Sequence, residues 1–423
     1  MFDQCANLNY VKCLATDISA QGSTGFWLNG VAATGTFVKA DGMDDWTVGP
    51  QDEWGSIHGI PAGWTVKNAS EEIASMNETP LTIEATEDAT TVTITNPLAQ
   101  TIEYSTDGGT SWISANNATI TISGINSGKT VLLRGDNAAY SSDGTAANSM
   151  GITADKDYYL YGNMMSLVSS TGFATLTTLT GNYAFARLFR SNSHLKSHAT
   201  KDLVLPATTL TSYCYNRMFD ECTSLVTAPE LPATNLATLC YNDMFWNCTA
   251  LKNAPVLPAT KLVPYCYTMM FFGCSSLEKA PDLIAPTLEG NCYEHMFMNC
   301  TSLNYVKCLA TDLGDETATD GWMTNVPATG TFVKAPGVDW SVKGTTEGTD
   351  FDDPSKPCTF VHGIPAGWTV ETSPIVYAHL NSDGEGNYCA TFYNESAGFT
   401  ADATTSVYTA KVSSGKEGGV DSG

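Results

Sequence analysis

The chain has 423 residues, of which 43% are hydrophobic, and carries 44 acidic against 20 basic residues, a formal net charge of −24. This content is typical of a folded protein with several domains, not of a disordered chain. The negative charge, without any run of lysines and arginines, argues against nucleic acid or an anionic membrane surface as a partner. No stretch approaches the roughly 18 consecutive apolar residues that a transmembrane helix requires, so we expect no membrane span.

The first phrase of the chain, MFDQCANLNYVKCLATDIS, returns from position 296 as MFMNCTSLNYVKCLATDLG. The echo continues, because 30–48 matches 325–342. A signal peptide would show a basic stretch followed by an apolar run, and the first phrase shows neither. We therefore expect 1–70 to hold the end of an upstream repeat array and its cap module, and the chain to be cut at both ends.

The next segment, 71–150, is predicted to be an immunoglobulin-like β-sandwich. Runs such as 91–95 and 119–122 alternate in the manner of half-buried strands and are separated by turn residues. Within it, GINSGKT at 124–130 approaches a phosphate-binding loop. Three residues separate its glycines where that loop has four, and a strand-like run follows where a helix is needed. A hairpin turn is the better interpretation.

From Leu205 the phrase LPATTLTSYCYNRMFDECTSLVTAPE is followed by close copies at a period of 26 residues. A fixed period in this range indicates units that stack, because one unit cannot bury its apolar face alone. Cys214, Met218 and Cys222 recur every four residues, which predicts one face of a helix. The following SLVTAPELP predicts a short strand and a turn.

Eleven of the thirteen cysteines lie in this repeated phrase. Equivalent cysteines of stacked units would lie about 5 Å apart, within disulfide range. The alternative is a set of buried thiols that pack as small apolar side chains and hydrogen-bond the turn, as Asn192 could do in a degenerate first unit. Zinc sites use closely spaced cysteine pairs, whereas seven residues separate Cys214 from Cys222. We predict no metal and no cofactor.

The phrase Met-Phe-x-x-Cys-x-x-Leu, followed by Ala-Pro-x-Leu-Pro-Ala-Thr, resembles the BspA-like leucine-rich repeats of surface proteins in gut-dwelling Gram-negative bacteria. The resemblance covers 155–310, with the tail of an upstream array at 1–13. It implies an α+β fold, in which a leucine-rich-repeat solenoid with cap modules accompanies the immunoglobulin-like β-sandwich. It also implies a protein that is secreted or held at the bacterial cell surface and that acts in adhesion.

On this basis the solenoid occupies 151–310 and a second cap module occupies 311–372. We expect the tryptophans of the two caps to cover the apolar end of an array, the alternative being that they stack against sugars: Trp27 and Trp322, Trp46 and Trp340, Trp64 and Trp368. The second cap carries an acidic insertion, GTTEGTDFDDPSKPC, with Asp352, Asp353 and Cys358, and we predict a loop there.

The last segment, 373–423, is predicted to begin a further β domain, with strands around Val376 and Cys389. The turn between them resembles the start of a calcium loop, with Asn381, Asp383, Glu385, Gly386 and Asn387. Position 12 of such a loop would be Phe392, which cannot bind calcium, so a plain β-hairpin is the better interpretation.

No histidine has a cysteine, serine or paired carboxylate at a catalytic spacing, so we expect no enzyme. The leading hypothesis is a non-catalytic protein that binds an extracellular protein or glycan through the solenoid surface. The candidate positions flank buried ones and vary while the framework stays fixed: Val226, Thr227, Lys252, Asn253, Glu278, Lys279, Asn304 and Tyr305. The alternative is a structural spacer that displays a distal domain, and a glycan-directed accessory module rests only on the tryptophans.

Overall fold

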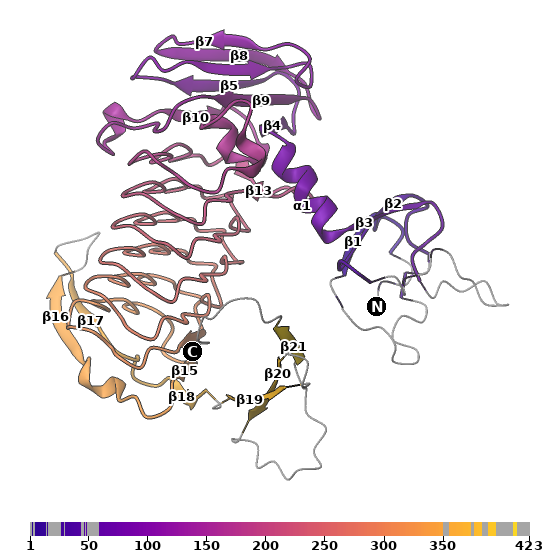
Figure 1. The fold of residues 1–423 in the computed structure, drawn as a ribbon. Coiled ribbons are helices and arrows are strands. Elements are labelled where there is room, and N and C mark those ends of the chain that lie inside the picture. Colours follow the sequence, from indigo (N-terminus) through magenta and orange to yellow (C-terminus); the bar gives the residue numbers. More distant parts are fainter. Residues whose placement is uncertain are drawn as a thin grey trace.

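The computed structural model describes residues 2, 5–13, 15, 27–28, 30–43, 46, 48, 59–349, 355–373, 376–382, 388–394 and 409–412. Within these residues the chain forms short strands in several small sheets, together with one α-helix and four 3-10 helices. None of the described helices is long and apolar enough to cross a bilayer. In Figure 1 the strands β4 to β10 lie above the stacked repeat units. Further small sheets are formed by the strands β1 to β3 and by the strands from β14 onward.

The N-terminal module is a small parallel sheet in the order β1-β2-β3, made of β1 (Tyr10–Cys13), β2 (Gly35–Lys39) and β3 (Trp64–Asn68). Its core includes Phe37 and Trp46, whose rings lie 4.9 Å apart. The helix α1 (Ala69–Glu78) follows directly. The Glu71 carboxylate accepts a hydrogen bond from the Asn68 N–H at 2.9 Å, which caps the start of the helix.

Two antiparallel sheets follow, and their strands alternate buried and exposed residues as half-buried strands do. One sheet has the order β10-β5-β8, from β5 (Thr90–Thr95), β8 (Thr119–Ile125) and β10 (Gly151–Ala154). The other contains β4 (Leu81–Ala85), β6 (Ile102–Ser105), β7 (Ile113–Ala115), β9 (Thr130–Gly135) and β11 (Tyr158–Asn163). GINSGKT connects β8 to β9, and both Gly124 and Gly128 have the positive φ of a turn.

The second sheet runs directly into the first 26-residue unit. Strand β11 pairs in parallel with β12 (Leu195–Lys196) and β13 (Leu203–Val204). Asn192, at the cysteine position of this unit, donates to the Ile152 carbonyl of β10 at 3.0 Å. Three short 3-10 helices lie around this junction: η1 (Ala146–Asn148), η2 (Met164–Leu167) and η3 (Phe173–Thr175).

The repeat units contain no helix at the predicted positions. Tyr213, Arg217 and Glu221 have positive φ, and a left-handed residue at every fourth position breaks a right-handed helix into successive turns. Successive backbone N–H groups then donate in turn to a carbonyl of the same unit and to a carbonyl of the next unit. The N–H of Met218 closes a turn to Tyr215 within the unit, whereas that of Phe219 donates to the Met244 carbonyl of the next unit at 2.9 Å.

Stacking of the units places equivalent side chains in columns through the interior. Parallel phenylalanine rings lie 5.6–5.9 Å apart, and the column contains Phe189, Phe219, Phe245, Phe271 and Phe297. Each such pair contributes about 0.5–1.5 kcal/mol beyond the burial of its area. The cysteines beside them are free thiols, and the Sγ of Cys248 lies 3.0 Å from the Phe219 carbonyl oxygen.

The stack ends on a buried tryptophan. Trp322 lies 6.3 Å from the rings of both Tyr293 and Phe297, and stacks on Trp340 at 5.3 Å. The parallel strands β14 (Tyr305–Cys308), β15 (Thr331–Lys334) and β18 (Thr369–Thr372) close this end, with η4 (Trp340–Val342) beside them. Trp368 is also buried and donates to the Pro327 carbonyl at 2.8 Å, so these rings are part of the core.

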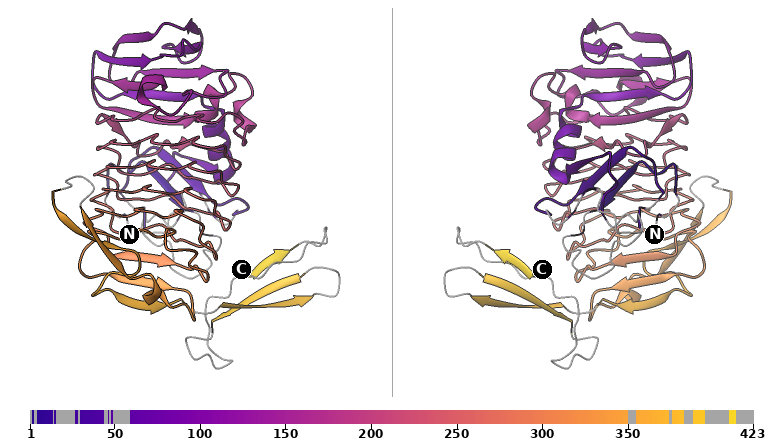
Figure 2. Two further views of the ribbon diagram at one scale, coloured as in Figure 1. Left: turned by 90° about the vertical axis from the view of Figure 1, so that its left-hand side faces the viewer. Right: turned by 90° about the vertical axis from the view of Figure 1, so that its right-hand side faces the viewer.

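The flanks of the acidic insertion are strands, so the predicted loop is wrong there. Strand β16 (Thr345–Thr349) pairs antiparallel with β17 (Pro357–Val361). Cys358 and Phe360 of β17 pack with Phe272 and Met298 of the stack, and this apolar contact favours pairing over a free loop. The hairpin lies along one side of the stack in both views of Figure 2. Asp352 and Asp353 lie outside the described residues.

A last sheet is formed by β19 (Val376–Ser382), β20 (Tyr388–Asn394) and β21 (Thr409–Val412), all antiparallel. Of the calcium-like sequence, Asn381 belongs to β19, while the rest lies outside the described residues.

The predicted fold class is wrong. The chain was expected to be α+β, with a leucine-rich-repeat solenoid of helices and strands, cap modules and an immunoglobulin-like β-sandwich. The described residues are instead mostly strands and turns with very little helix, and their sheets are small, with none closed or continuous along the units. The units do stack, but through turns and isolated bridges such as Thr227 to Asn253.

Candidate functional site

The eight residues selected from the sequence lie on one face of the stack, two from each of four successive units. Each pair directly follows a buried leucine, and these leucines are Leu225, Leu251, Leu277 and Leu303. All of the pairs are exposed except for Tyr305, which is half-buried. We call this set the exposed row: Val226, Thr227, Lys252, Asn253, Glu278, Lys279, Asn304 and Tyr305.

Neighbouring units bring members of the exposed row into contact. The Asn253 amide donates to the Thr227 hydroxyl at 3.0 Å. The Lys279 ammonium lies 5.1 Å from the centre of the Tyr305 ring, within cation–π range. Backbone hydrogen bonds join the pairs as well, since the Val226 carbonyl accepts from Lys252 at 2.9 Å. The row is therefore one ordered surface in which chemistry changes from unit to unit.

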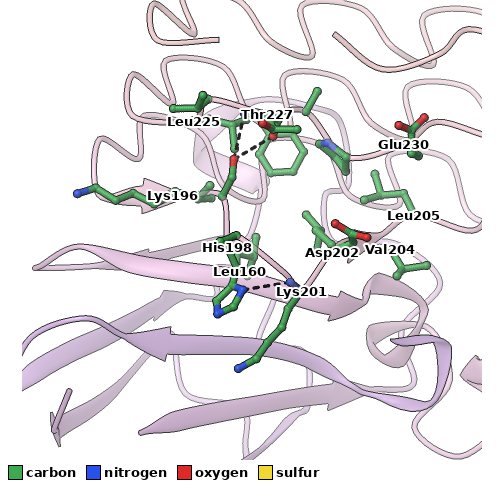
Figure 3. Close-up of a pocket in the computed structure, with 18 of the residues that line it drawn as sticks. Leu160, Lys196, His198, Lys201, Asp202, Val204, Leu205, Leu225, Thr227 and Glu230 are labelled. Atoms are coloured by element: carbon green, nitrogen blue, oxygen red, sulfur yellow. Dashed lines mark hydrogen bonds between the residues drawn. The ribbon is translucent and has the colours of Figure 1, made fainter. Parts of the chain in front are cut away.

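A cavity of about 870 Å³ opens at the end of this row nearest the sandwich (Figure 3). Its origin is a difference in length between units. Leu195 and Leu205 are ten positions apart, whereas the equivalent Leu225 and Leu231 are six apart. The four extra residues lie in the segment 197–202, and five of the six residues of this segment line the cavity. Val226 and Thr227 of the exposed row line the cavity.

The segment 197–202 is held by polar contacts at both of its ends. The Ser197 hydroxyl takes the place of a neighbouring strand, because it donates to the Thr227 carbonyl at 3.0 Å and accepts from the Thr227 N–H at 3.1 Å. At the other end, the Lys201 ammonium lies 2.6 Å from the Glu84 carboxylate of β4, which also accepts from the Tyr161 hydroxyl at 2.8 Å. Burial raises the pKa of Tyr161.

His198 fixes the turn between these two ends. Its Nδ1 accepts from the N–H groups of Thr200 and Lys201, both at 3.0 Å. The ring packs edge-on against Tyr159 and Tyr161. Burial, with the nearby Lys201 charge, lowers the pKa of His198. The neutral ring is the form that can accept both hydrogen bonds.

Most of the residues that line the cavity are apolar, and five are charged: Lys12, Lys196, Lys201, Asp202 and Glu230. Lys196 pairs with Asp157 and Lys201 pairs with Glu84, so the charges of both are matched by carboxylates outside the cavity lining. Asp202 and Glu230 are exposed lining residues, and among the described residues neither has an ion pair in the structure. The site therefore combines an apolar interior with two carboxylates whose charges are unmatched.

The sequence-based selection missed the residues that are specific to the cavity, above all His198, Lys201, Asp202 and Glu230. The sequence did contain a signal for the cavity, because Leu195 and Leu205 of the first unit are farther apart than the equivalent Leu225 and Leu231 of the next unit. The histidines show no catalytic arrangement with a nucleophile among the described residues. His295 and His362 lie at the end of the stack, and His362 accepts from the Gly321 N–H at 3.0 Å; His58 lies outside the described part.

Comparisons with known proteins add no relative: no protein-family model, no curated protein and no solved structure matches this chain.

Proposed function

We propose that this protein is a non-catalytic binding protein whose exposed row recognises an extracellular protein or glycan. The observation that supports this best is the exposed row itself. Its members sit at equivalent positions of stacked units, differ in charge and size, and contact one another, while the leucines beside them are invariant and buried. Such a surface combines a rigid support with side chains that can vary without disturbing the core.

A location outside the cell or at its surface is part of the proposal and rests on the sequence resemblance alone. The alternative function is a spacer that holds a distal domain away from the surface. The two differ in one respect, since a spacer needs no ligand. An elongated particle in small-angle scattering, together with no ligand in a broad screen, would favour the spacer.

The test is binding of the purified chain to arrays of mucins, matrix proteins and glycans. Alanine at all eight positions of the exposed row should weaken binding to a retained partner by more than about tenfold, because dominant contact residues each contribute about 1–2 kcal/mol or more. A control variant carries Thr223→Ala, Thr249→Ala, Glu289→Ala and Thr301→Ala, which are exposed elsewhere on the stack. Unchanged binding by the eight-residue variant would exclude the row as the binding surface.

A further inference from the structure

We infer that the cavity beside the first unit takes a lysine or arginine side chain that is presented between apolar residues of an extended protein segment. This deepens the proposed function, because it names the partner chemistry at the Val226 and Thr227 end of the exposed row. The cavity volume of about 870 Å³ is within the range of sites that enclose ligands of several hundred daltons.

The charge of the site favours a cation. Asp202 lies in the segment 197–202 and Glu230 lies in the next unit, so two carboxylates border the same opening from different elements (Figure 3). The three lysines of this lining are already engaged: Lys196 is paired with Asp157, Lys201 is paired with Glu84, and Lys12 of β1 has a partner as well. The chain as a whole carries a formal charge of −24, which adds long-range attraction for a basic segment.

The backbone of the cavity wall also favours a cation. Pro206, Pro229 and Pro232 line it, and proline supplies a carbonyl acceptor without an N–H donor. An ammonium or guanidinium group would find acceptors among the carbonyl groups of these three residues.

The surroundings favour a protein segment with apolar residues on both sides of the cation. Val226 is 41% exposed, and in the following units Val256 is 64% and Ile284 37% exposed. Val226 is both a lining residue and the first member of the exposed row, and Val256 lies beside the lining residue Glu230, whose carboxylate accepts from the Val256 N–H at 3.4 Å. An extended segment could therefore place one basic side chain in the cavity and continue along the row.

The test uses fluorescein-labelled pentapeptides of sequence Leu-Pro-X-Pro-Leu, where X is arginine, lysine, citrulline or glutamate, measured by fluorescence anisotropy on the whole chain. The arginine and lysine peptides should bind, the citrulline peptide about tenfold more weakly, and the glutamate peptide not at all. Higher salt should weaken the first two, since their recognition is electrostatic. No binding by any peptide, or equal binding of the arginine and glutamate peptides, would overturn the inference.

Two variants locate the site. Asp202→Asn with Glu230→Gln removes both charges at exposed positions, and should reduce binding of the arginine peptide by about tenfold. Ala199→Phe should reduce binding of all the peptides by filling the cavity from an exposed lining position. The matched control, Glu289→Gln with Glu316→Gln, changes the net charge equally at exposed positions away from the cavity. Equal loss in the control, or no loss in either cavity variant, would contradict the assignment.

A further variant separates the two proposals. Alanine at the six row positions outside the cavity, from Lys252 to Tyr305, leaves the cavity lining intact. Peptide binding that persists in this variant, with array binding that is also unchanged, would refute the exposed row and keep the cavity. If this variant loses array binding, and neither it nor the wild type binds any peptide, the exposed row is supported and the cavity is refuted.

Discussion

Asp243 is a carboxylate buried within a turn of the stack. Its Oδ2 accepts from the Arg217 guanidinium at 3.0 Å, but its Oδ1 has no hydrogen-bond partner. Burial raises the pKa of Asp243 to about 6. The folded state therefore holds a proton that the unfolded state releases near pH 4, and the free energy of unfolding falls as the pH rises from about 4 to 6.

The prediction is that Asp243→Asn raises the free energy of unfolding at pH 8 by about 1–3 kcal/mol, since two pKa units correspond to about 3 kcal/mol. Below pH 4 the wild type and the variant should have nearly the same stability. Urea unfolding at pH 4, 6 and 8 measures this. A variant that is less stable than the wild type at pH 8 would show that pairing with Arg217 outweighs the cost of burial.

His198 should make the segment 197–202 sensitive to acid. Its pKa is lowered in the folded protein, so the stability that it contributes is complete above the ordinary value near 6.5 and is lost as the pH falls from there through the lowered pKa of the folded state. His198→Asn keeps a side-chain acceptor without this titration. The difference in unfolding free energy between wild type and variant should shrink from pH 7.5 to 5.5, and a constant difference would refute the role.

Tyr215, Tyr241, Tyr267 and Tyr293 form a second column of stacked rings in the interior. The buried hydroxyl groups of two of them, Tyr215 and Tyr267, have no hydrogen-bond partner. Since an unpaired buried hydroxyl costs about 1–3 kcal/mol, Tyr267→Phe should stabilise the chain by about 1 kcal/mol. Tyr140→Phe is the control, because the Tyr140 hydroxyl donates to the Leu167 carbonyl and its loss should destabilise. Thermal unfolding of the two variants should therefore shift in opposite directions.

At the scale of the element, the turn-based unit explains why the helix was predicted. Cys214, Met218 and Cys222 do point inward every four residues, as the sequence indicates. Successive four-residue turns produce this spacing just as i, i+4 positions of a helix do, so the period alone cannot separate the two. The distinguishing feature is a positive φ at Tyr213, Arg217 and Glu221. These three residue types carry no signal for it, but the equivalents of Glu221 in the next units, Asn247, Gly273 and Asn299, are residues that favour a positive φ.

The left-handed positions should be sensitive to side-chain shape. Tyr265 has φ +61° and is exposed. Tyr265→Gly and Tyr265→Val both remove the aromatic ring, but glycine adopts this conformation freely whereas a β-branched residue is strained there. Tyr265→Val should therefore be less stable than Tyr265→Gly by about 1–2 kcal/mol in chemical unfolding. Equal stability would argue for a right-handed backbone at this position.

The exposed row and the cavity were not equally accessible to prediction. The exposure of the row could be expected from the sequence, because Val226 and Thr227 directly follow a leucine that recurs at the same position of every unit. The cavity depends on where four extra residues go, and that is decided by the contacts of Ser197, Lys201 and Glu84 across separate elements. The longer spacing was visible in the sequence, but the direction of the segment was not.

For the whole molecule, the free thiols report on the integrity of the stack. Burial raises the pKa of Cys214 and Cys308 to about 12, and the stack cysteines are buried, whereas Cys5 of the N-terminal module is exposed. Native chain treated with iodoacetamide at pH 8 should be alkylated rapidly at Cys5, and at the stack cysteines only as fast as the stack unfolds. Rapid alkylation of Cys248 or Cys274 in the folded protein would contradict the arrangement.

Alternating hydrogen bonds join units 26 residues apart and leave the exposed row on the surface. Native-state hydrogen exchange, followed by mass spectrometry, tests this most directly. Peptides covering 214–222, 240–248 and 266–274 should be the most protected and should exchange together, while β16 (Thr345–Thr349), which is exposed along its length, should exchange much faster. Exchange of the three turn segments as fast as that hairpin would contradict the stack and the binding surface built on it.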